Sequence, residues 1–391
     1  MAFIGEKLRR AHLETTTALP ELMFSLSSPQ QERAGERRPL LLNAPLPDPL
    51  PTRASRGEGE NFWCLCHALN FGRRAQRGLC AGPSQIECAA KLMRKLLSIG
   101  LLIFWAGAAS AQGPAQADFK RIEDVVYGRK FGTALTLDVF QPEKPNGCGI
   151  LFMVSGGFFS SHDAINPGFY RALLERGYTV FAVVHGSQPK FIIPEIEQDI
   201  HRAVRFVRHN AAQYGVNPVK LGITGASAGG HLSLTLGTQG SPGKADSKDP
   251  VDHETSAVQA VACFFPPTDF LNWREPGDDQ VGIGPTGGQF KAAFGPRSNA
   301  PEGREVLGKE ISPIYYVNPK MPPTLVIHGD ADKLVPIYQA EIFKKRCEEM
   351  GAPFKLIVRE GKDHGWKEMA DDMKIFADWF DEHLRGLKTS K

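Results

Sequence analysis

From about residue 134 onward, short apolar runs alternate with longer segments whose apolar residues recur every three or four positions. In residues 193–214, for example, Ile196, Ile200, Val204 and Val207 would line one face of a helix. The predicted strands are residues 134–140, 149–154, 178–184, 219–224, 257–265, 323–328 and 354–358. The predicted helices are residues 167–176, 193–214, 230–236, 338–350 and 368–386. This alternation predicts an α/β domain with a mostly parallel sheet and helices on both faces.

Residues 268–312 interrupt the alternation. They are rich in Gly, Pro and charged residues, as in Pro276-Gly277-Asp278-Asp279. Because long insertions between core strands are usually functional or mobile, we interpret this segment as a flap-like insertion over a site.

A secretory signal peptide is predicted at residues 93–111. Met93-Arg94-Lys95 is basic, residues 96–105 form an apolar core, and Ala109-Ser110-Ala111 has the small-x-small pattern that signal peptidase reads. The apolar core is too short to span a bilayer comfortably. The pattern therefore predicts a secreted or periplasmic protein without a stable membrane anchor, and a buried internal helix is the alternative interpretation.

The preceding residues 1–92 show neither helical nor strand periodicity. Four of the seven cysteines fall here, but Cys64-Leu65-Cys66-His67 matches none of the usual zinc spacings. We interpret residues 1–92 as a non-native or disordered extension, produced by a start codon assigned too far upstream of Met93. The catalytic domain would then be residues 112–391.

Composition narrows the function without deciding it. The chain of 391 residues is 42% hydrophobic and 23% charged, and its net charge of +3 is too small to argue for a nucleic-acid partner. The predicted domain holds three cysteines, Cys148, Cys263 and Cys347, which show no disulfide framework but leave a single pairing open. The oligomeric state is left open as well.

The strongest chemical signal is Gly225-Ala226-Ser227-Ala228-Gly229, a G-x-S-x-G sequence between a predicted strand and a helix-compatible segment. Strand, sharp turn and helix are the context of a nucleophile elbow, in which flanking glycines avoid clashes around a strained serine. Without partners for Ser227, a plain Gly/Ser turn would explain the match equally well.

A serine nucleophile needs a base and an acid, which in this strand order follow it along the chain. Asp332 follows one predicted strand and His364 follows the next, so both lie where open α/β sheets bind ligands. We assign Asp332 as the acid and His364 as the base. The weaker candidates for these roles are Asp330, Asp269, Asp363, His231, His328 and His185.

An oxyanion hole is predicted after the strand at 149–154, where Val154-Ser155-Gly156-Gly157-Phe158 offers backbone N–H groups without obstructing side chains. We expect donors from Gly156 or Gly157 and from Ala228. Loss of one such donor typically costs about 3 kcal/mol of transition-state stabilisation.

Together these residues resemble the α/β-hydrolase family, in particular its bacterial esterase/lipase branch with feruloyl- and acetylxylan-esterase-like enzymes, which is related to the catalytic domain of prolyl oligopeptidases. The resemblance covers about residues 120–388. It rests on Ser155-Gly156-Gly157-Phe158, Asp199, Tyr214-Gly215-Val216-Asn217-Pro218, Gly225-Ala226-Ser227-Ala228-Gly229-Gly230-His231-Leu232, His328-Gly329-Asp330-Ala331-Asp332 and His364-Gly365-Trp366. One departure is Ser155, where many relatives have a His that orders the loop.

The resemblance implies the α/β-hydrolase fold and hydrolysis through an acyl-enzyme on Ser227, without a metal or cofactor. Small-molecule or polysaccharide esters, in particular acetyl or feruloyl esters of carbohydrates, are the implied substrates. A prolyl-oligopeptidase-type peptidase, a lipase and a non-catalytic binding module on the same fold are the alternatives.

Overall fold

The computed structural model describes residues 119–388. The predicted signal peptide at 93–111, the predicted extension at 1–92 and the domain boundary at 112 lie outside these described residues. Within residues 119–388, no helix is long and apolar enough to cross a membrane.

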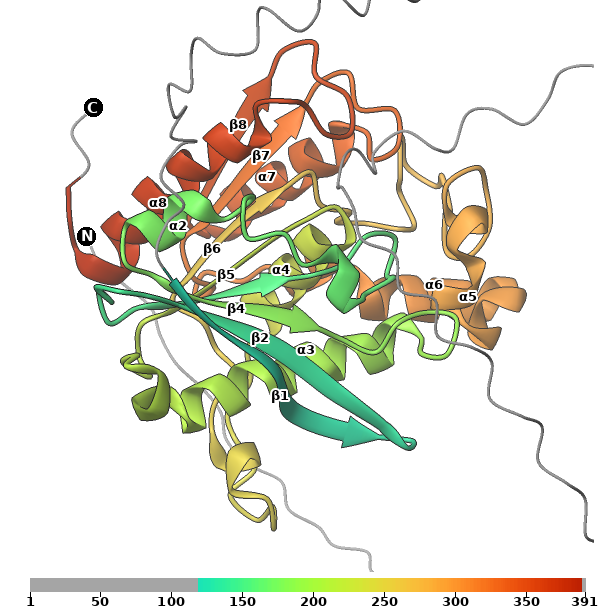
Figure 1. The fold of residues 1–391 in the computed structure, drawn as a ribbon. Coiled ribbons are helices and arrows are strands. Elements are labelled where there is room, and N and C mark those ends of the chain that lie inside the picture. The colour runs from blue at the N-terminus through green and yellow to red at the C-terminus, as the bar shows by residue number, and fades with distance from the viewer. Residues whose placement is uncertain (1–118, 389–391) are drawn as a thin grey trace, which may run out of the picture. The chain divides into compact units, whose positions relative to one another are not determined.

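An eight-stranded sheet organises the described residues, with strand order β1-β2-β4-β3-β5-β6-β7-β8 (Figure 1). Its strands are β1 (Phe119–Lys130), β2 (Thr133–Pro142), β3 (Gly149–Met153), β4 (Thr179–Val184), β5 (Leu221–Ala226), β6 (Ala260–Phe264), β7 (Thr324–Gly329) and β8 (Phe354–Arg359). Strand β2 pairs antiparallel with β1 and with β4, and every other pairing is parallel. The predicted fold class, a mostly parallel sheet between helices, is confirmed.

Helices cover both faces of this sheet. The α-helices are α2 (Arg171–Glu175), α3 (Ile193–His209), α4 (Ala228–Gln239), α5 (Lys291–Phe294), α6 (Pro301–Ile311), α7 (Tyr338–Met350) and α8 (Met369–Arg385). Short 3₁₀ helices are η1 (His162–Ala164), η2 (Ala211–Tyr214), η3 (Pro250–His253), η4 (Gly287–Phe290), η5 (Pro296–Asn299) and η6 (Pro313–Tyr316). One hydrophobic core lies under α2 and α8, and the other lies under α3, α4 and α7.

The two cores follow from the alternation of side chains along each strand. In β3, Ile150 faces the core under α8 and the next residue, Leu151, faces the core under α3. In β4, Val180 and Phe181 divide in the same way. Because successive strand residues point to opposite faces, a continuous apolar run buries both faces of a sheet, which explains the lack of polar alternation in these strands.

The direction of chain progression through the sheet changes between β3 and β5. Met153 at the end of β3 pairs with Gly225 near the end of β5, so the loops that follow these strands begin side by side. Ligands of open α/β sheets bind at such a change of direction, beyond the carboxyl ends of the strands. The predicted nucleophile and the predicted oxyanion loop therefore meet at this edge.

The segment predicted as a flap is a folded wall. It contains η4, α5, η5 and α6, and it buries Phe270, Trp273 and Phe294. The sequence left open whether two of the three cysteines pair. In the described residues, Cys148, Cys263 and Cys347 are all free and buried.

Candidate active site

Ser227 lies at a sharp turn between β5 and α4, with φ 55° and ψ −121°. A side chain at Gly225 would place its Cβ 2.5 Å from the carbonyl oxygen of Gly229, and one at Gly229 would lie 2.6 Å from the carbonyl oxygen of Met153. Both contacts are with backbone, so neither can be relieved by rotating a side chain. Glycine at both positions is what allows the strained serine turn to pack against β3.

The predicted nucleophile, base and acid form one chain of hydrogen bonds. The Ser227 hydroxyl lies 2.9 Å from Nε2 of His364, and Nδ1 of His364 lies 2.7 Å from Oδ2 of Asp332. Both distances suit direct proton transfer and orientation of the imidazole ring. The structure therefore brings together the three residues assigned from the sequence, which are separated by 137 and 32 positions.

The Asp332 carboxylate is buried and fully engaged. Its Oδ1 accepts the backbone N–H groups of Leu334 at 2.9 Å and Val335 at 2.8 Å. Burial alone would raise the pKa of Asp332, but His328 at 3.5 Å and the hydrogen bond from His364 outweigh it and lower that pKa to about 2. Asp332 is therefore ionised at neutral pH, when it can stabilise a positive charge on His364.

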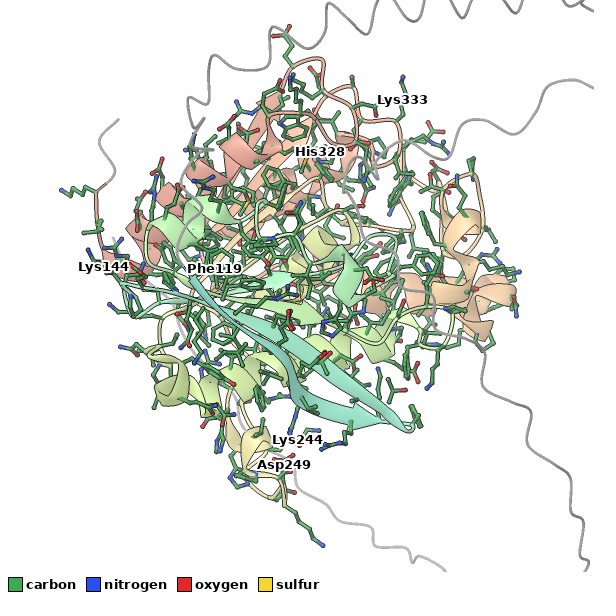
Figure 2. All side chains as sticks on the ribbon, in the orientation of Figure 1. Phe119, Lys144, Lys244, Asp249, His328 and Lys333 are labelled. Carbon is green, nitrogen blue, oxygen red and sulfur yellow. The ribbon has the colours of Figure 1, made fainter. Side chains whose placement is uncertain are left out.

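His328 supports the loop that carries Asp332 from the interior of the protein. It is fully buried at the end of β7, and its Nε2 donates to the carbonyl oxygen of Val335 at 2.8 Å. Figure 2 shows His328 within the fold, whereas Lys333, on the loop that follows β7, reaches outward. The loop is thus anchored on its inner side, where Asp332 lies.

The loop that carries His364 is held by aromatic and ionic contacts. Nε1 of Trp366 donates to Oδ2 of Asp372 at 2.8 Å, and Arg359 pairs with the same carboxylate. The ring of Phe265 packs on the His364 ring with centroids 4.5 Å apart. These contacts restrict the imidazole to the plane between its two partners.

Two aspartates beside the triad have structural roles. Oδ1 of Asp330 accepts the N–H of Gly361 at 2.6 Å. Oδ1 of Asp363 accepts the N–H groups of Lys333 at 3.0 Å and His364 at 2.8 Å. Both carboxylates join the loops after β7 and β8, which keeps acid and base at a fixed separation.

The other candidates are engaged elsewhere. Asp269 is buried and accepts hydrogen bonds from Asn272 and Tyr315 in the insertion. His231 is fully buried in α4, where its Nδ1 donates to the carbonyl oxygen of Pro267 at 3.1 Å. Neither forms a hydrogen bond with the Ser227 hydroxyl in residues 119–388.

His185 is also outside the triad. It is buried, and its Nδ1 donates to the carbonyl oxygen of Gly186 at 2.8 Å. Burial lowers its pKa to about 4, so the ring is neutral at pH 7. Its backbone N–H donates to the hydroxyl oxygen of Ser160, which places it against the oxyanion loop.

Two backbone N–H groups remain available beside Ser227. Within the described residues, the N–H groups of Gly157 and Ala228 form no hydrogen bond, and both residues line the cavity at Ser227. The N–H of Gly156 is different, because it donates to the carbonyl oxygen of Phe159 at 3.0 Å. Of the two glycines predicted as alternative donors, Gly156 is therefore excluded because its N–H is already bonded. Gly157 and Ala228 are the pair that could hold an oxyanion.

A small apolar pocket opens from this point, and its apolar lining was not predicted from the sequence. It touches Ser227 and both available N–H groups, and its cavity volume is about 50 Å³. Most of the lining comes from the insertion and from the oxyanion and acid loops, through Phe158, Pro267, Phe270, Trp273, Gln280, Thr286, Gly287, Phe290, Phe294, Leu334 and Val335. The sequence of residues 268–312 did not indicate this apolar lining, because most of the segment is Gly, Pro or charged and only a few inward-facing residues form the lining.

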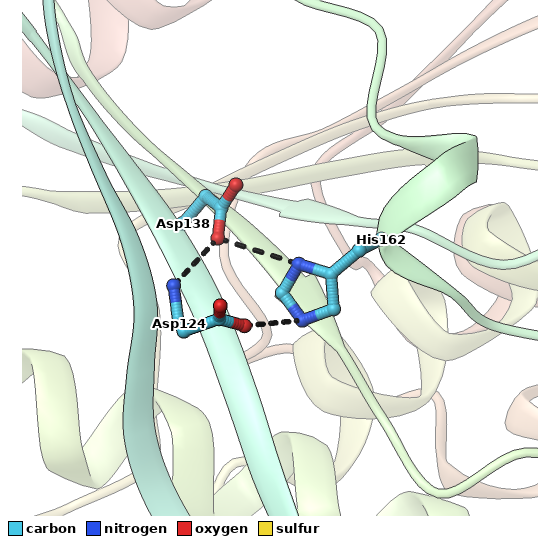
Figure 3. A group of neighbouring side chains, drawn as sticks. All are labelled: Asp124, Asp138 and His162. Atoms are coloured by element: carbon cyan, nitrogen blue, oxygen red, sulfur yellow. Dashed lines mark hydrogen bonds and ion pairs between the residues drawn. The ribbon is translucent and has the colours of Figure 1, made fainter. Parts of the chain in front are cut away.

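A second group of polar side chains, Asp124, Asp138 and His162, lies at β1, β2 and η1 (Figure 3). Their ligand atoms lie within 4.8 Å of one another, as a cation site requires. Nε2 of His162 already lies 2.7 Å from the hydroxyl of Thr136, and Asp138 binds the Arg121 guanidinium at 2.5 Å. We interpret the group as a clamp that attaches the end of the oxyanion loop to the β1–β2 hairpin.

Comparison with known proteins gives consistent similarities. The BD-FAE family matches residues 137–347. Esterase LipQ of Mycobacterium tuberculosis is 29% identical over 247 residues, which cover 61% of this chain and 56% of LipQ. An acetylxylan esterase of Xylanibacter ruminicola is 35% identical over 105 residues, or 25% of this chain and 21% of that protein. The chain thus spans only part of the length of these curated relatives.

A solved structure, a truncated form of a carbohydrate esterase from gut microbiota, is similar over 70% of this chain and all of that one. The two are 28% identical and superpose with a TM-score of 0.61. The similarity includes the fold on which the candidate site is built.

The low pKa of Asp332 predicts a pH-dependent contribution to stability. Because the folded-state pKa of about 2 is below the ordinary value of 3.8, the contribution is present above about pH 4 and is lost as the pH falls towards 2. Replacing Asp332→Asn should lower the free energy of unfolding at pH 7 by about 2 kcal/mol, and by about 1 kcal/mol less at pH 3. Urea unfolding of both proteins at the two pH values measures this, and an equal difference at both would contradict it.

Proposed function

The chain belongs to the BD-FAE family and has the α/β-hydrolase fold of esterases, and from this premise we propose that it is a carboxylic-ester hydrolase with Ser227 as nucleophile. The observation that carries the proposal is the hydrogen-bonded chain from the Ser227 hydroxyl through His364 to the ionised Asp332. The printed names of the similar proteins, an esterase, an acetylxylan esterase and a carbohydrate esterase, support the same chemistry.

The geometry supports the following reaction. Nε2 of His364 removes the Ser227 proton as the serine oxygen attacks the ester carbonyl carbon, and Asp332 stabilises the imidazolium that forms. The negative charge on the carbonyl oxygen is held by the N–H groups of Gly157 and Ala228. The imidazolium then protonates the alcohol oxygen as its bond to carbon breaks, which leaves an acyl group on Ser227. Water attacks this acyl-enzyme with His364 again as base and releases the acid.

The apolar pocket is best assigned to the acyl group. His364 must reach the alcohol oxygen to protonate it, so the alcohol leaves on the His364 side of Ser227. The pocket is lined by Ser227, Gly157 and Ala228, and His364 does not contribute to its lining. The remaining substituent of the carbonyl carbon, the acyl chain, would therefore occupy it.

The size of the pocket favours a short acyl chain. A water-sized group needs about 10–15 Å³, so a cavity of about 50 Å³ has room for on the order of four such groups. An acetyl group fits this space, whereas a feruloyl group, with its aromatic ring, is far larger. Of the acetyl and feruloyl esters of carbohydrates considered above, the pocket supports acetyl esters.

The alternatives receive less support. The aromatic side chains of Phe290, Phe294 and Trp273 line the pocket, and its volume of about 50 Å³ disfavours the long acyl chains of a lipase. A binding module without activity would not require an ionised acid, a base and a nucleophile at hydrogen-bonding distances. A peptidase would act through the same triad, and its separation from an esterase requires substrates.

Secretion or export to the periplasm through a signal peptide that begins at Met93 is part of the proposal and rests on the sequence pattern alone. Amino-terminal sequencing of the mature protein from its natural source should give a first residue close to Gln112. A mature protein that retains residues 1–92 would contradict both the export signal and the proposed start at Met93.

Replacing Ser227→Ala should reduce kcat for p-nitrophenyl acetate by at least about 1,000-fold, because removal of the nucleophile leaves only binding and the oxyanion donors. Steady-state kinetics on the purified protein measure the effect. Ser247→Ala, in a surface loop outside the site, is the matched control and should keep wild-type kinetics. An unchanged rate in Ser227→Ala would disprove the proposed function, and peptide cleavage without ester cleavage by the wild type would favour the peptidase.

The acyl pocket predicts a preference for short chains. The wild type should hydrolyse p-nitrophenyl acetate with a kcat/KM at least about tenfold higher than the octanoate, and methyl ferulate should be a poor substrate. Phe290→Ala should reduce the preference by enlarging the pocket that Phe290 lines, while Gln289→Ala, its exposed neighbour, should not. Equal kcat/KM for acetate and octanoate in the wild type would contradict the assignment.

A further inference from the structure

The oxyanion loop has a conformation that its own sequence does not favour. Gly157 and Phe158 have φ of +54° and +65°, so two successive residues lie in the left-handed region. A non-glycine residue such as Phe158 is strained in this region, and the strain persists only when its surroundings hold it. Some other part of the structure must therefore stabilise this loop.

Gln188, in the loop between β4 and α3, makes the required contacts. Its side-chain Nε2 donates to the carbonyl oxygen of Gly157, and its backbone N–H donates to the carbonyl oxygen of Phe158 at 3.2 Å. The residue is 5% exposed, so these bonds are shielded from water. One residue thus binds the carbonyl groups of both left-handed residues.

The direction of the Gly157 N–H depends on the two peptide units that flank this residue. That N–H belongs to the same peptide unit as the carbonyl of Gly156, which accepts the N–H of Phe159 at 2.9 Å. Since C=O and N–H point in opposite directions across a trans peptide, the N–H of Gly157 is directed away from Phe159. Gln188 binds the carbonyl on the other side of Gly157, so both peptide planes that flank this residue are fixed.

The loop that carries Gln188 is itself fixed by contacts with α3. Oδ2 of Asp199 in α3 accepts the N–H of Gly186 at 2.9 Å, and Oδ1 pairs with Nζ of Lys130 at 2.7 Å. Close to Gln188, the hydroxyl of Ser187 accepts the N–H of Ser160 at 3.2 Å. These contacts attach the oxyanion loop to α3 and to the β1–β2 hairpin through the residues around Gln188.

The side chain of Ser155 gives the loop no support. Its hydroxyl is buried and has no hydrogen-bond partner in residues 119–388, so the side chain at the start of the loop does not bind the loop's backbone. The loop is held by the internal bond from the Ser160 hydroxyl to the carbonyl of Val154 and by residues that lie about 30 positions further along the chain.

We propose that Gln188 is a positioning residue that holds the Gly157 peptide in the orientation needed to donate to the oxyanion. It does not touch the substrate. The inference rests on the proposed function, since it assigns the support of the same oxyanion hole. Loss of the Gln188 side-chain donor would free the Gly157–Phe158 peptide unit. Rotation about the N–Cα and Cα–C bonds of Gly157 would then let the preceding peptide unit, which carries the Gly157 N–H, turn away from the oxyanion.

The test compares Gln188→Met, which keeps the length of the side chain and removes the donor, with Gln141→Met. Gln141 is the matched control because its Nε2 also donates to a backbone carbonyl, that of Tyr214 at 3.2 Å, outside the site. A phosphonate that titrates Ser227 counts active sites, and kcat and KM for p-nitrophenyl acetate are expressed per titrated site. The Kd of a trifluoromethyl ketone, which forms an oxyanion on the enzyme, is measured in parallel.

We expect Gln188→Met to lower kcat per site about tenfold or more with KM changed less than twofold, and to weaken ketone binding by a similar factor. Gln141→Met should match the wild type in all three. Unchanged kcat per site and unchanged ketone affinity in Gln188→Met would overturn the proposal, as would a rise in KM alone. If Gln188→Met does not fold, Gln188→Asn, which is one methylene too short to reach Gly157, must show the same loss of kcat for the proposal to stand.

These outcomes are separate from failure of the proposed function. That failure would appear as full activity in Ser227→Ala, whereas failure of the present inference would appear as full activity per site in Gln188→Met with Ser227→Ala inactive.

Discussion

The whole candidate site depends on a close approach of backbone to backbone between β3, β5 and the start of α4. Gly225 and Gly229 leave no room for a Cβ, so the first turn of α4 lies directly against the end of β3. This contact places the strained Ser227 and the N–H of Ala228 beside the loop that carries Gly157. A side chain at either glycine would separate nucleophile and oxyanion donor, however well the rest of the sheet were formed.

Hydrogen bonds and charge then hold the side chains of Asp332 and His364 in place. Burial removes the water that would stabilise the negative charge of the Asp332 carboxylate. Two backbone N–H groups and His364 replace that water as hydrogen-bond partners. The base is correspondingly held on three sides, by Asp332, by the ring of Phe265 and by the Ser227 hydroxyl. The site is thus organised before substrate arrives, which lowers the cost of reorganising charge during reaction.

The sequence predicted those parts of the structure that depend on local patterns. Helix α7 occupies residues 338–350 as its periodicity indicated, and the acid and base lie at the ends of predicted strands. Helix α2 is shorter than predicted, Arg171–Glu175 instead of 167–176, because Asn166 accepts the N–H groups of Gly168 and Phe169 and holds the preceding residues in a turn.

Other features depend on tertiary contacts that have no local pattern. Helix α4 begins at Ala228 and includes Gly229 and Gly230, since close backbone packing outweighs the low helix propensity of glycine. Gln188 is one polar residue in a short loop, and only the folded structure brings it to Gly157. Ser227, Asp332 and His364 lie at the ends of strands, whereas the wall of the apolar pocket comes largely from the insertion between β6 and β7. In the proposed enzyme, catalysis and selectivity are therefore encoded in different segments of the chain, and exchange of the insertion for one of another shape would offer a route to new substrates with the same chemistry.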